Sequence, residues 1–175
     1  MHYAKYEGIV VNRRAVGDAD SFLTIFTRDA GKLSVYAKSI RSTRSKRIGS
    51  LDLFSRIRFE VAERGGHRTL THVELLDSYR NNKKALTNIG RLFELGELVD
   101  ALVPEEDPHR EVYELLSTAL THLSHFQTPE YVLRFKKKLL FLLGYGDREL
   151  SLSEIDAYIE SLLSRPLRAP RVLTK

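Results

Sequence analysis

Ser21-Phe-Leu-Thr-Ile-Phe-Thr27, Arg28-Asp-Ala-Gly-Lys32 and Leu33-Ser-Val-Tyr-Ala37 follow one another without a break and decide the fold of the first half of the chain. The first and third segments are rich in β-branched and aromatic residues, which favour strands. Gly31 lies in the connecting loop at a position where hairpins commonly need a residue with a left-handed backbone conformation, so the stretch predicts a β-hairpin. Apolar residues occupy both faces of the first strand, which suits a barrel wall that also packs against other structure.

Three more short segments have the composition or the alternation of strands: Gly8–Val11, Ser55–Ala62 and Thr69–Leu76. Gly17 lies in a turn before the hairpin, and Gly65-Gly66 lies in a turn between the last two strands. Five short strands in succession leave no room for the crossovers that parallel sheets need. They favour a small antiparallel barrel of OB type, and strand spacing alone leaves an SH3-like barrel as the alternative.

Beyond the strands the apolar period changes from two to 3.6, which indicates helices. The first helical stripe comprises Ala85, Leu86, Ile89, Leu92, Phe93, Val99 and Leu102. Two helices are expected to start at Asp107-Pro108 and Thr128-Pro129, because the first residue can cap a helix and Pro suits its first position. Ser151–Glu154 offers a capping box for a last helix. We therefore expect a two-domain α+β protein, with an N-terminal five-stranded antiparallel OB-type barrel in residues 1–79 and a C-terminal α-helical bundle in residues 80–175.

Charge is unevenly distributed along the chain. The 175 residues carry a formal net charge of +5, with 15 Lys and Arg against 9 Asp and Glu in residues 1–80 and 13 against 14 in residues 81–175. A basic first half favours a polyanionic partner. No cysteine is present, which excludes disulfides and thiolate zinc sites. The first residues lack the apolar run of a signal peptide, and no run is long enough to span a membrane, so we expect a cytoplasmic protein without membrane contact.

The most basic stretch, Lys38 to Gly49, holds five cations and no acid. Its Ser and Gly residues favour turns, and its like charges repel, so it is expected to be a surface loop between two strands. Tyr36 projects from the same strand face as Lys38, and Arg13 with Arg14 leaves the first strand at a possible rim. Cations that follow phosphates beside an aromatic face can bind a single strand. The predicted DNA-binding residues are Arg13, Arg14, Tyr36, Lys38, Arg41, Arg44, Lys46 and Arg47.

Each of these assignments has a plainer alternative. The basic stretch can be a solvated loop without a partner, and Tyr36 can be an interface tyrosine packed on the helical half. A second cluster, Arg134 with Lys137 and Lys138, lies beside an apolar helix edge. It can be a solvated helix face, or it can bind an acidic peptide that ends in an aromatic residue.

Enzymatic chemistry has little support in the residues. Asp18 and Asp20 are typical of a turn, and the acids at 105–107 precede a helix, where they complement its dipole. His122 and His125 are three residues apart but have no carboxylate at ligand spacing. The Gly-x-x-x-x-Gly-Lys-[Ser/Thr] phosphate cradle is absent from the sequence. We therefore expect a non-enzymatic protein that needs neither a metal nor a cofactor.

Taken together, these residues resemble the RecO family of bacterial recombination mediators. The similar segments are Gly8–Val11, Arg13–Asp20, Leu23–Lys32, Ala37–Phe54, Glu97–His109, Leu142–Tyr145 and Leu163–Leu173, and the Phe26–Lys32 part is the most specific. The resemblance implies an OB barrel followed by a helical domain. It also implies binding of single- and double-stranded DNA, annealing of complementary strands, and loading of recombinase onto coated single strands. The implied partners are RecR and the C-terminal tail of the single-stranded-DNA-binding protein.

This chain departs from the family pattern in one place. Many members insert a four-cysteine zinc module after the Leu-Gly-Tyr motif, whereas here Gly146–Ser153 leads to the last helix without a cysteine. The prediction is therefore a DNA repair and recombination mediator without zinc. An adaptor that binds an acidic protein tail, with weak or no DNA binding, is the alternative. A nuclease that uses Asp18 or Asp20 is a third hypothesis, for which we expect no cleavage.

Overall fold

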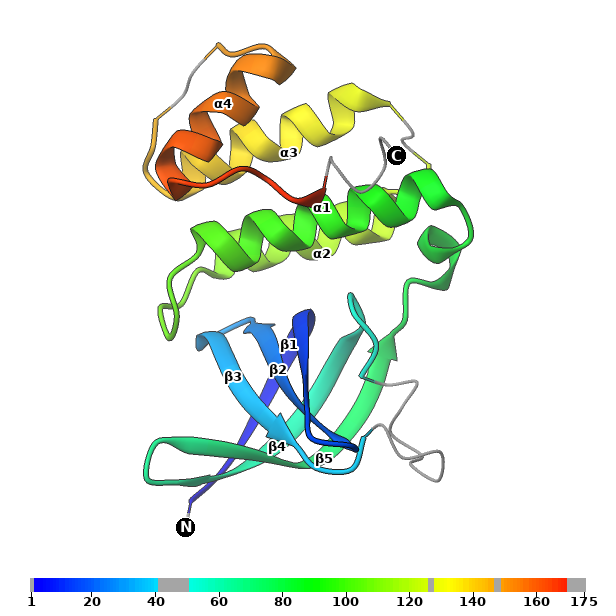
Figure 1. Cartoon of the computed structure of the whole chain (residues 1–175), viewed down its shortest axis with the longest axis vertical. Helices are drawn as coiled ribbons and strands as arrows, with labels where there is room; N and C mark the ends of the chain where they lie inside the picture. The colour runs from blue at the N-terminus through cyan, green and yellow to red at the C-terminus, as the bar shows by residue number, and fades with distance from the viewer. Residues whose placement is uncertain (1, 41–50, 126–127, 147–148, 170–175) are drawn as a thin grey trace. The chain divides into compact units, whose positions relative to one another are not determined.

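The computed structural model of the chain describes residues 2–40, 51–125, 128–146 and 149–169 (Figure 1). The chain forms two compact units: Met1–Ser78 with Pro104–Arg110, and Tyr79–Val103 with Glu111–Lys175. The domain ranges expected from the sequence, 1–79 for the DNA-binding barrel and 80–175 for the helical domain, remain predictions. In the structure the short segment Pro104–Arg110 packs with the first half of the chain. The periodicity of the sequence did not indicate this grouping.

The first unit is a closed barrel with the strand order β1-β2-β3-β5-β4. Within the described residues its strands are β1 (His2–Val16), β2 (Asp20–Thr27), β3 (Gly31–Ala37), β4 (Arg56–Arg64) and β5 (His67–Asp77). The OB-type barrel expected from the sequence is confirmed, although β1 extends well beyond the expected Gly8–Val11. An odd number of strands cannot alternate in direction around a closed barrel, so one neighbouring pair must be parallel. That pair is β3 and β5, which meet at Tyr36 and Thr69.

Alternation along each strand fills the barrel with apolar side chains. Successive residues point to opposite faces of a strand, so every second residue can enter the core. The fully enclosed members of the core include Val10, Leu23, Ile25, Val35, Ile57, Phe59 and Val61. The even-numbered residues of β2, such as Phe22, therefore lie on the outer face of the barrel.

Pro104–Arg110 returns to the β2–β3 hairpin. The backbone N–H of Glu106 donates to the carbonyl of Lys32 over 3.1 Å. Gly31 has a φ of 72°, and a Cβ added there would lie 2.5 Å from the backbone of Asp107. The expected helix start at Asp107-Pro108 is wrong: the backbone there packs against the hairpin, and the helix begins later, at Arg110.

The second unit contains, in its described residues, a 3₁₀ helix η2 (Arg80–Lys83) and the helices α1 (Leu86–Leu102), α2 (Arg110–His122), α3 (Pro129–Leu142) and α4 (Leu152–Leu163). The expected start of α3 is confirmed, since Thr128 precedes a Pro in the first turn. The capping box of α4 is also present, with the Ser151 N–H donating to Glu154 over 2.8 Å. No helix in the described ranges is both long and apolar enough to cross a membrane.

The buried stripe of α1 differs from the expected one. Leu86 and Phe93 are 73% and 45% exposed, whereas Leu95 and Leu98 are fully buried. The helix is apolar around much of its circumference, so periodicity alone could not select the buried face. Leu86 and Phe93, which the sequence placed on the apolar stripe, are therefore not part of the buried face.

Two sets of ion pairs and hydrogen bonds connect α1 to later parts of the second unit. Lys136 on α3 is 1% exposed and forms ion pairs with Glu94 on α1 and, at 2.5 Å, with Asp156 on α4. Glu97 accepts hydrogen bonds from the Arg165 guanidinium at 2.7 Å and from the backbone N–H of Ala169 at 2.9 Å. Burial raises the pKa of Glu97, but these donors lower it more, so the net pKa lies below its ordinary value of 4.5.

Candidate functional site

Three side chains from three neighbouring strands form a cluster on the outer face of the barrel. Arg14 on β1 is the register partner of Phe22 on β2, which is in turn the partner of Tyr36 on β3. The Phe22 and Tyr36 ring centroids are 5.3 Å apart, with an angle of 55° between the ring planes. The Arg14 guanidinium carbon lies 5.5 Å from the centre of the Phe22 ring. A cation and two aromatic rings are therefore held in a row across the strands.

The register separates the two arginines that the sequence suggested as a pair. Arg13 is the partner of Leu23, which is fully buried in the core, whereas Arg14 is the partner of the outward Phe22. Because neighbouring residues on a strand point to opposite faces, the two side chains start from opposite sides of the sheet. Arg14 belongs to the outer cluster, and the role of Arg13 in DNA binding stays a prediction.

Asp20 fixes the position of Tyr36. The Tyr36 hydroxyl donates a hydrogen bond to Asp20, and the backbone N–H of Ser39 donates to the other carboxylate oxygen over 2.7 Å. The hydrogen bond to Asp20, with smaller effects of burial and of the Asp20 charge, raises the pKa of Tyr36 above 10.0. Both of these partners of Tyr36, Phe22 and Asp20, belong to β2 and thus to the same unit as Tyr36. Asp20 thus connects the aromatic pair to the start of the basic stretch, next to the exposed Lys38.

The predicted phosphate contacts Arg41, Arg44, Lys46 and Arg47 lie outside the described residues. The nearest described residues on either side are Ile40, which is 1% exposed, and Leu51, which is fully buried. The two described residues that flank the basic stretch therefore both lie in the barrel core.

Two members of this site were missed by reasoning from the sequence. Phe22 was assigned only to a barrel wall, although its place between buried Ser21 and Leu23 already puts it on the other face. Asp20 was interpreted as a turn residue. Its bond to Tyr36 joins residues sixteen positions apart, which a local pattern cannot reveal.

The second predicted cluster lies on α3. Arg134 is exposed, Lys137 pairs with Glu149 at 3.3 Å, and the Lys138 ammonium lies 5.1 Å from the centre of the Phe141 ring. Phe141 is 53% exposed. These positions recur at intervals of three and four, so they share one face of the helix. This face combines cations with an exposed aromatic ring.

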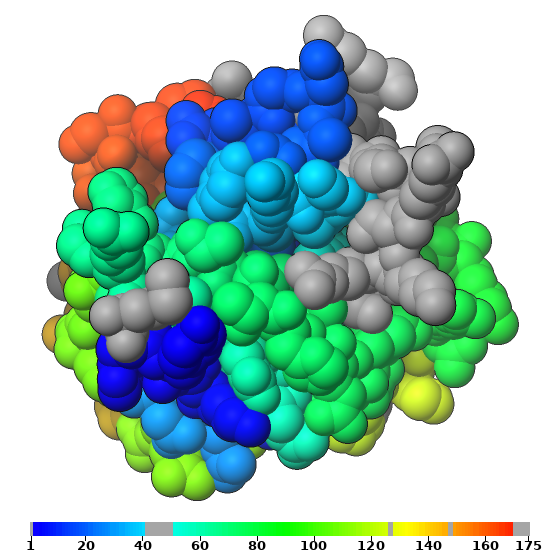
Figure 2. Space-filling model, turned by 90° about the horizontal axis from the view of Figure 1, so that it is seen from below, coloured from blue at the N-terminus to red at the C-terminus, as the bar shows by residue number. Residues whose placement is uncertain are grey.

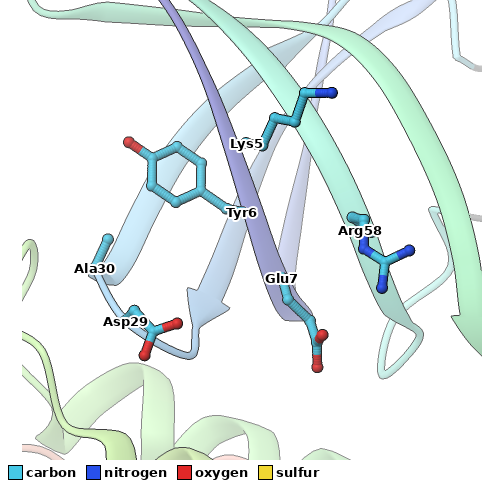
Figure 3. A pocket seen from close by; sticks show the side chains of 6 residues that line it. All are labelled: Lys5, Tyr6, Glu7, Asp29, Ala30 and Arg58. Atoms are coloured by element: carbon cyan, nitrogen blue, oxygen red, sulfur yellow. The ribbon is translucent and has the colours of Figure 1, made fainter.

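A pocket of about 440 Å³ lies elsewhere on the barrel, between β1, β4 and the β2–β3 turn (Figure 3). Figure 3 shows Tyr6 directed to the opposite side of β1 from Lys5. The charged side chains that line it are each engaged: Lys5 with Glu60, Glu7 with Arg56, Arg58 with Glu74 and Asp29 with Arg110. Both signs of charge are thus compensated around the pocket, and we assign it no ligand.

The described residues contain no group of three or more His, Cys, Asp and Glu that could hold a metal ion. Two of the acids weighed for catalysis, Asp20 and Glu106, have other contacts. Asp20 accepts hydrogen bonds from Tyr36 and Ser39, and Glu106 accepts one from Arg68 at 2.7 Å. The arrangement of the outer cluster suits recognition of a ligand by charge and stacking.

The closed barrel and the helices that follow define a two-part protein with an OB-type first unit. Comparison with known families agrees with that class. The family described as recombination protein O N terminal matches residues 1–79, and the family described as recombination protein O C terminal matches residues 86–148. The chain belongs to the RecO family, and the resemblance inferred from the sequence is confirmed.

Curated relatives carry the name DNA repair protein RecO. The chain is 35% identical to that of Symbiobacterium thermophilum over 142 residues, which cover 79% of this chain and 56% of the relative. It is 28% identical to that of Pelotomaculum thermopropionicum, with 83% and 57% covered, and 31% identical to one of Dehalococcoides mccartyi, with 82% and 57% covered. The chain thus spans a little over half the length of these relatives.

Proposed function

We propose that this protein binds single-stranded DNA on the outer face of β2 and β3 and acts, without catalysing a reaction, in DNA repair and recombination. The observation that carries the proposal is the row formed by Arg14, Phe22 and Tyr36. OB-type barrels bind oligonucleotides mainly on the face of strands 2 and 3. The names of the relatives, DNA repair protein RecO, support the same role.

The chemistry of binding follows from the residues in the row. Bases stack on Phe22 and Tyr36, while Arg14 and Lys38 contact phosphates at its edge. Arg41, Arg44, Lys46 and Arg47 supply further phosphate contacts from the basic stretch. Stacking is tolerant of sequence because every base has an aromatic face, so we expect binding without strong base preference.

Family membership extends the proposal to later steps. Neutralising the phosphates of two strands lowers their repulsion, and loosely stacked bases keep their pairing edges accessible. The protein would therefore also bind double-stranded DNA and anneal complementary strands in the cytoplasm. With RecR it would help to load recombinase onto strands coated by single-stranded-DNA-binding protein.

A salt series tests the proposal. If roughly three to five loop cations contact a single strand, the logarithm of the binding constant should fall against the logarithm of salt with a slope of roughly −2 to −3.5. Replacing Arg41, Arg44, Lys46 and Arg47 by Ala should flatten the slope and abolish annealing. A variant with Ala at Arg134, Lys137 and Lys138 of α3 removes charge elsewhere and serves as the control. Equal DNA affinity of the quadruple variant and the wild type would reject the loop assignment.

A second function is favoured by the exposed face of α3. We propose that Arg134, Lys137 and Lys138, together with Phe141, bind an acidic peptide with an aromatic C-terminal residue, such as the tail of the single-stranded-DNA-binding protein. The cations would attract the acids while the aromatic residue packs beside Phe141.

Peptide titration separates this function from DNA binding. Arg134→Glu with Lys138→Glu should abolish binding of a labelled acidic peptide and leave DNA affinity in place. The matched control reverses Arg80 and Lys84, two exposed cations before α1. Loss of peptide binding in both variants to the same extent would show that net charge, and not the α3 face, attracts the peptide.

A further inference from the structure

The row of Arg14, Phe22 and Tyr36 continues around the barrel. Tyr36 is the register partner of Thr69 on β5, Thr69 of Ala62 on β4, and Ala62 of Tyr3 at the start of β1. Thr69 and Ala62 follow the same outer face, because their neighbours Leu70 and Val61 are buried in the core. Figure 2 shows β3 in cyan, β5 in green and the start of β1 in dark blue on one surface of the barrel.

The row begins and ends on the same strand because the barrel is staggered. Its two ends, Arg14 and Tyr3, are eleven positions apart on β1, and a bulge between Val10 and Asn12 accounts for one irregular step. A closed barrel requires such a stagger of its register. Residues far apart on β1 are therefore the two ends of one continuous path across the strands.

We propose that single-stranded DNA follows this path beyond Tyr36, across Thr69 and Ala62, to a further stacking site at Tyr3. The inference rests on the proposed function and extends the β2–β3 site by a second aromatic position. Tyr3 is 62% exposed, more than any other aromatic side chain among the exposed large hydrophobic residues that the structure describes. Between the two tyrosines, Thr69 and Ala62 have small side chains, so no bulky side chain on the path itself blocks a strand there.

The charges on the two sides of the path differ. On one side the next outward pair is Lys5 and Glu60, joined at 2.8 Å, so its charges compensate each other. On the other side lies the β4–β5 hairpin, where Arg64 is exposed. The neighbouring Arg68 is bound to Glu63 at 3.0 Å and to Glu106, so it is not counted as a phosphate contact. OB-type barrels also use the loop between strands 4 and 5 for oligonucleotides.

The length of the path sets the length of strand it can hold. From Arg14 to Tyr3 it crosses five strand spacings of about 4.8 Å, which gives roughly 24 Å along the surface. At about 3.4 Å per stacked nucleotide this corresponds to at most about seven nucleotides. The β1–β3 part alone, two spacings or about 10 Å, corresponds to about three.

Binding of oligothymidylates of increasing length tests the inference. The full chain carries its purification tag at the C-terminal end, so that nothing is added next to Tyr3. Tyr3→Ala should bind an oligomer of about four nucleotides like the wild type, but should lose about five-fold or more in affinity for one of about ten nucleotides. Tyr145→Ala, which removes another partly exposed tyrosine from the second unit, is the matched control and should change neither.

The outcomes distinguish the inference from the proposed function. Equal affinity of Tyr3→Ala and wild type for the long oligomer overturns the extended path, provided that Phe22→Ala still weakens both lengths. A wild type that binds neither oligomer at low salt, or a Phe22→Ala variant that binds both normally, rejects the β2–β3 site itself. As a direct readout, an oligomer with 5-iodouracil at one end should photocrosslink to Tyr3, and crosslinks confined to the second unit would contradict the path.

Discussion

Replacing Phe22 by Ala should weaken single-strand binding without changing its salt dependence. Phe22 lies between Arg14, at 5.5 Å, and Tyr36, at 5.3 Å, so its ring is the centre of the outer cluster. Stacking of one base is worth about 1–3 kcal/mol, which corresponds to a loss of about 5- to 150-fold in affinity. The salt slope should stay the same, because an aromatic ring releases no counterions.

The same substitution has a cost in stability that can be worked out from its contacts. The aromatic pair contributes about 0.5–1.5 kcal/mol and the cation–π contact about 0.5–1 kcal/mol, so Phe22→Ala should lower the free energy of unfolding by roughly 1–2.5 kcal/mol. Urea unfolding measures this loss, and fluorescence anisotropy of a labelled oligonucleotide measures affinity at several salt concentrations. Arg14→Ala is the comparison, since losing one phosphate contact should reduce the slope by about 0.7. A folded Phe22→Ala variant with wild-type affinity would refute the stacking role.

Three further changes probe the two units. Gly31→Ala should cost at least about 1–2 kcal/mol, and more than Gly17→Ala, because both positions have positive φ but only Gly31 faces backbone atoms within 4 Å; urea unfolding of the two variants compares them. Glu97→Gln should destabilise the protein above pH 4.5, and its difference from wild type should shrink as the pH falls through the lowered pKa of Glu97, since the wild-type carboxylate then protonates and loses the same interactions; a difference that is constant with pH would contradict this. Lys136→Met should lower the free energy of unfolding by about 3 kcal/mol. This value is near the lower end for a broken buried ion pair, because the side chain of one partner, Asp156, is 33% exposed. A variant as stable as wild type in urea would show that the ion pairs are dispensable.

The barrel could be predicted from the sequence because its signals are local. The alternation from Leu33 to Ala37 and the glycines at Gly31 and Gly65 fix strands and turns within a few residues. The parallel contact of β3 and β5 and the stagger of the barrel arise from closure, so no local pattern contains them. The start of α2 was mispredicted at Asp107-Pro108, because a sequence that can cap a helix is instead used to pack on a distant hairpin.

The candidate site was predictable only in part. Tyr36 and Lys38 follow from alternation on β3, and the basic stretch follows from its composition. The partnership of Arg14 with Phe22 depends on the register between β1 and β2, which a two-residue error in strand bounds would change. Lys136, which adjoins Lys137 and Lys138 in the sequence, is buried and forms ion pairs with acids of two other helices, and composition alone does not separate it from its exposed neighbours.

The most direct measurement of the central claim is an NMR titration of the ¹⁵N-labelled full chain with an unlabelled oligothymidylate at low salt. If single strands bind the outer face of β2 and β3, the amide signals of Arg14, Phe22, Tyr36 and Ser39 should shift most, in proportion to occupancy. Signals around the pocket at Tyr6 should change little. Shifts that are confined to α3, or an unchanged spectrum at millimolar oligonucleotide, would contradict the assignment of this face as the DNA-binding site.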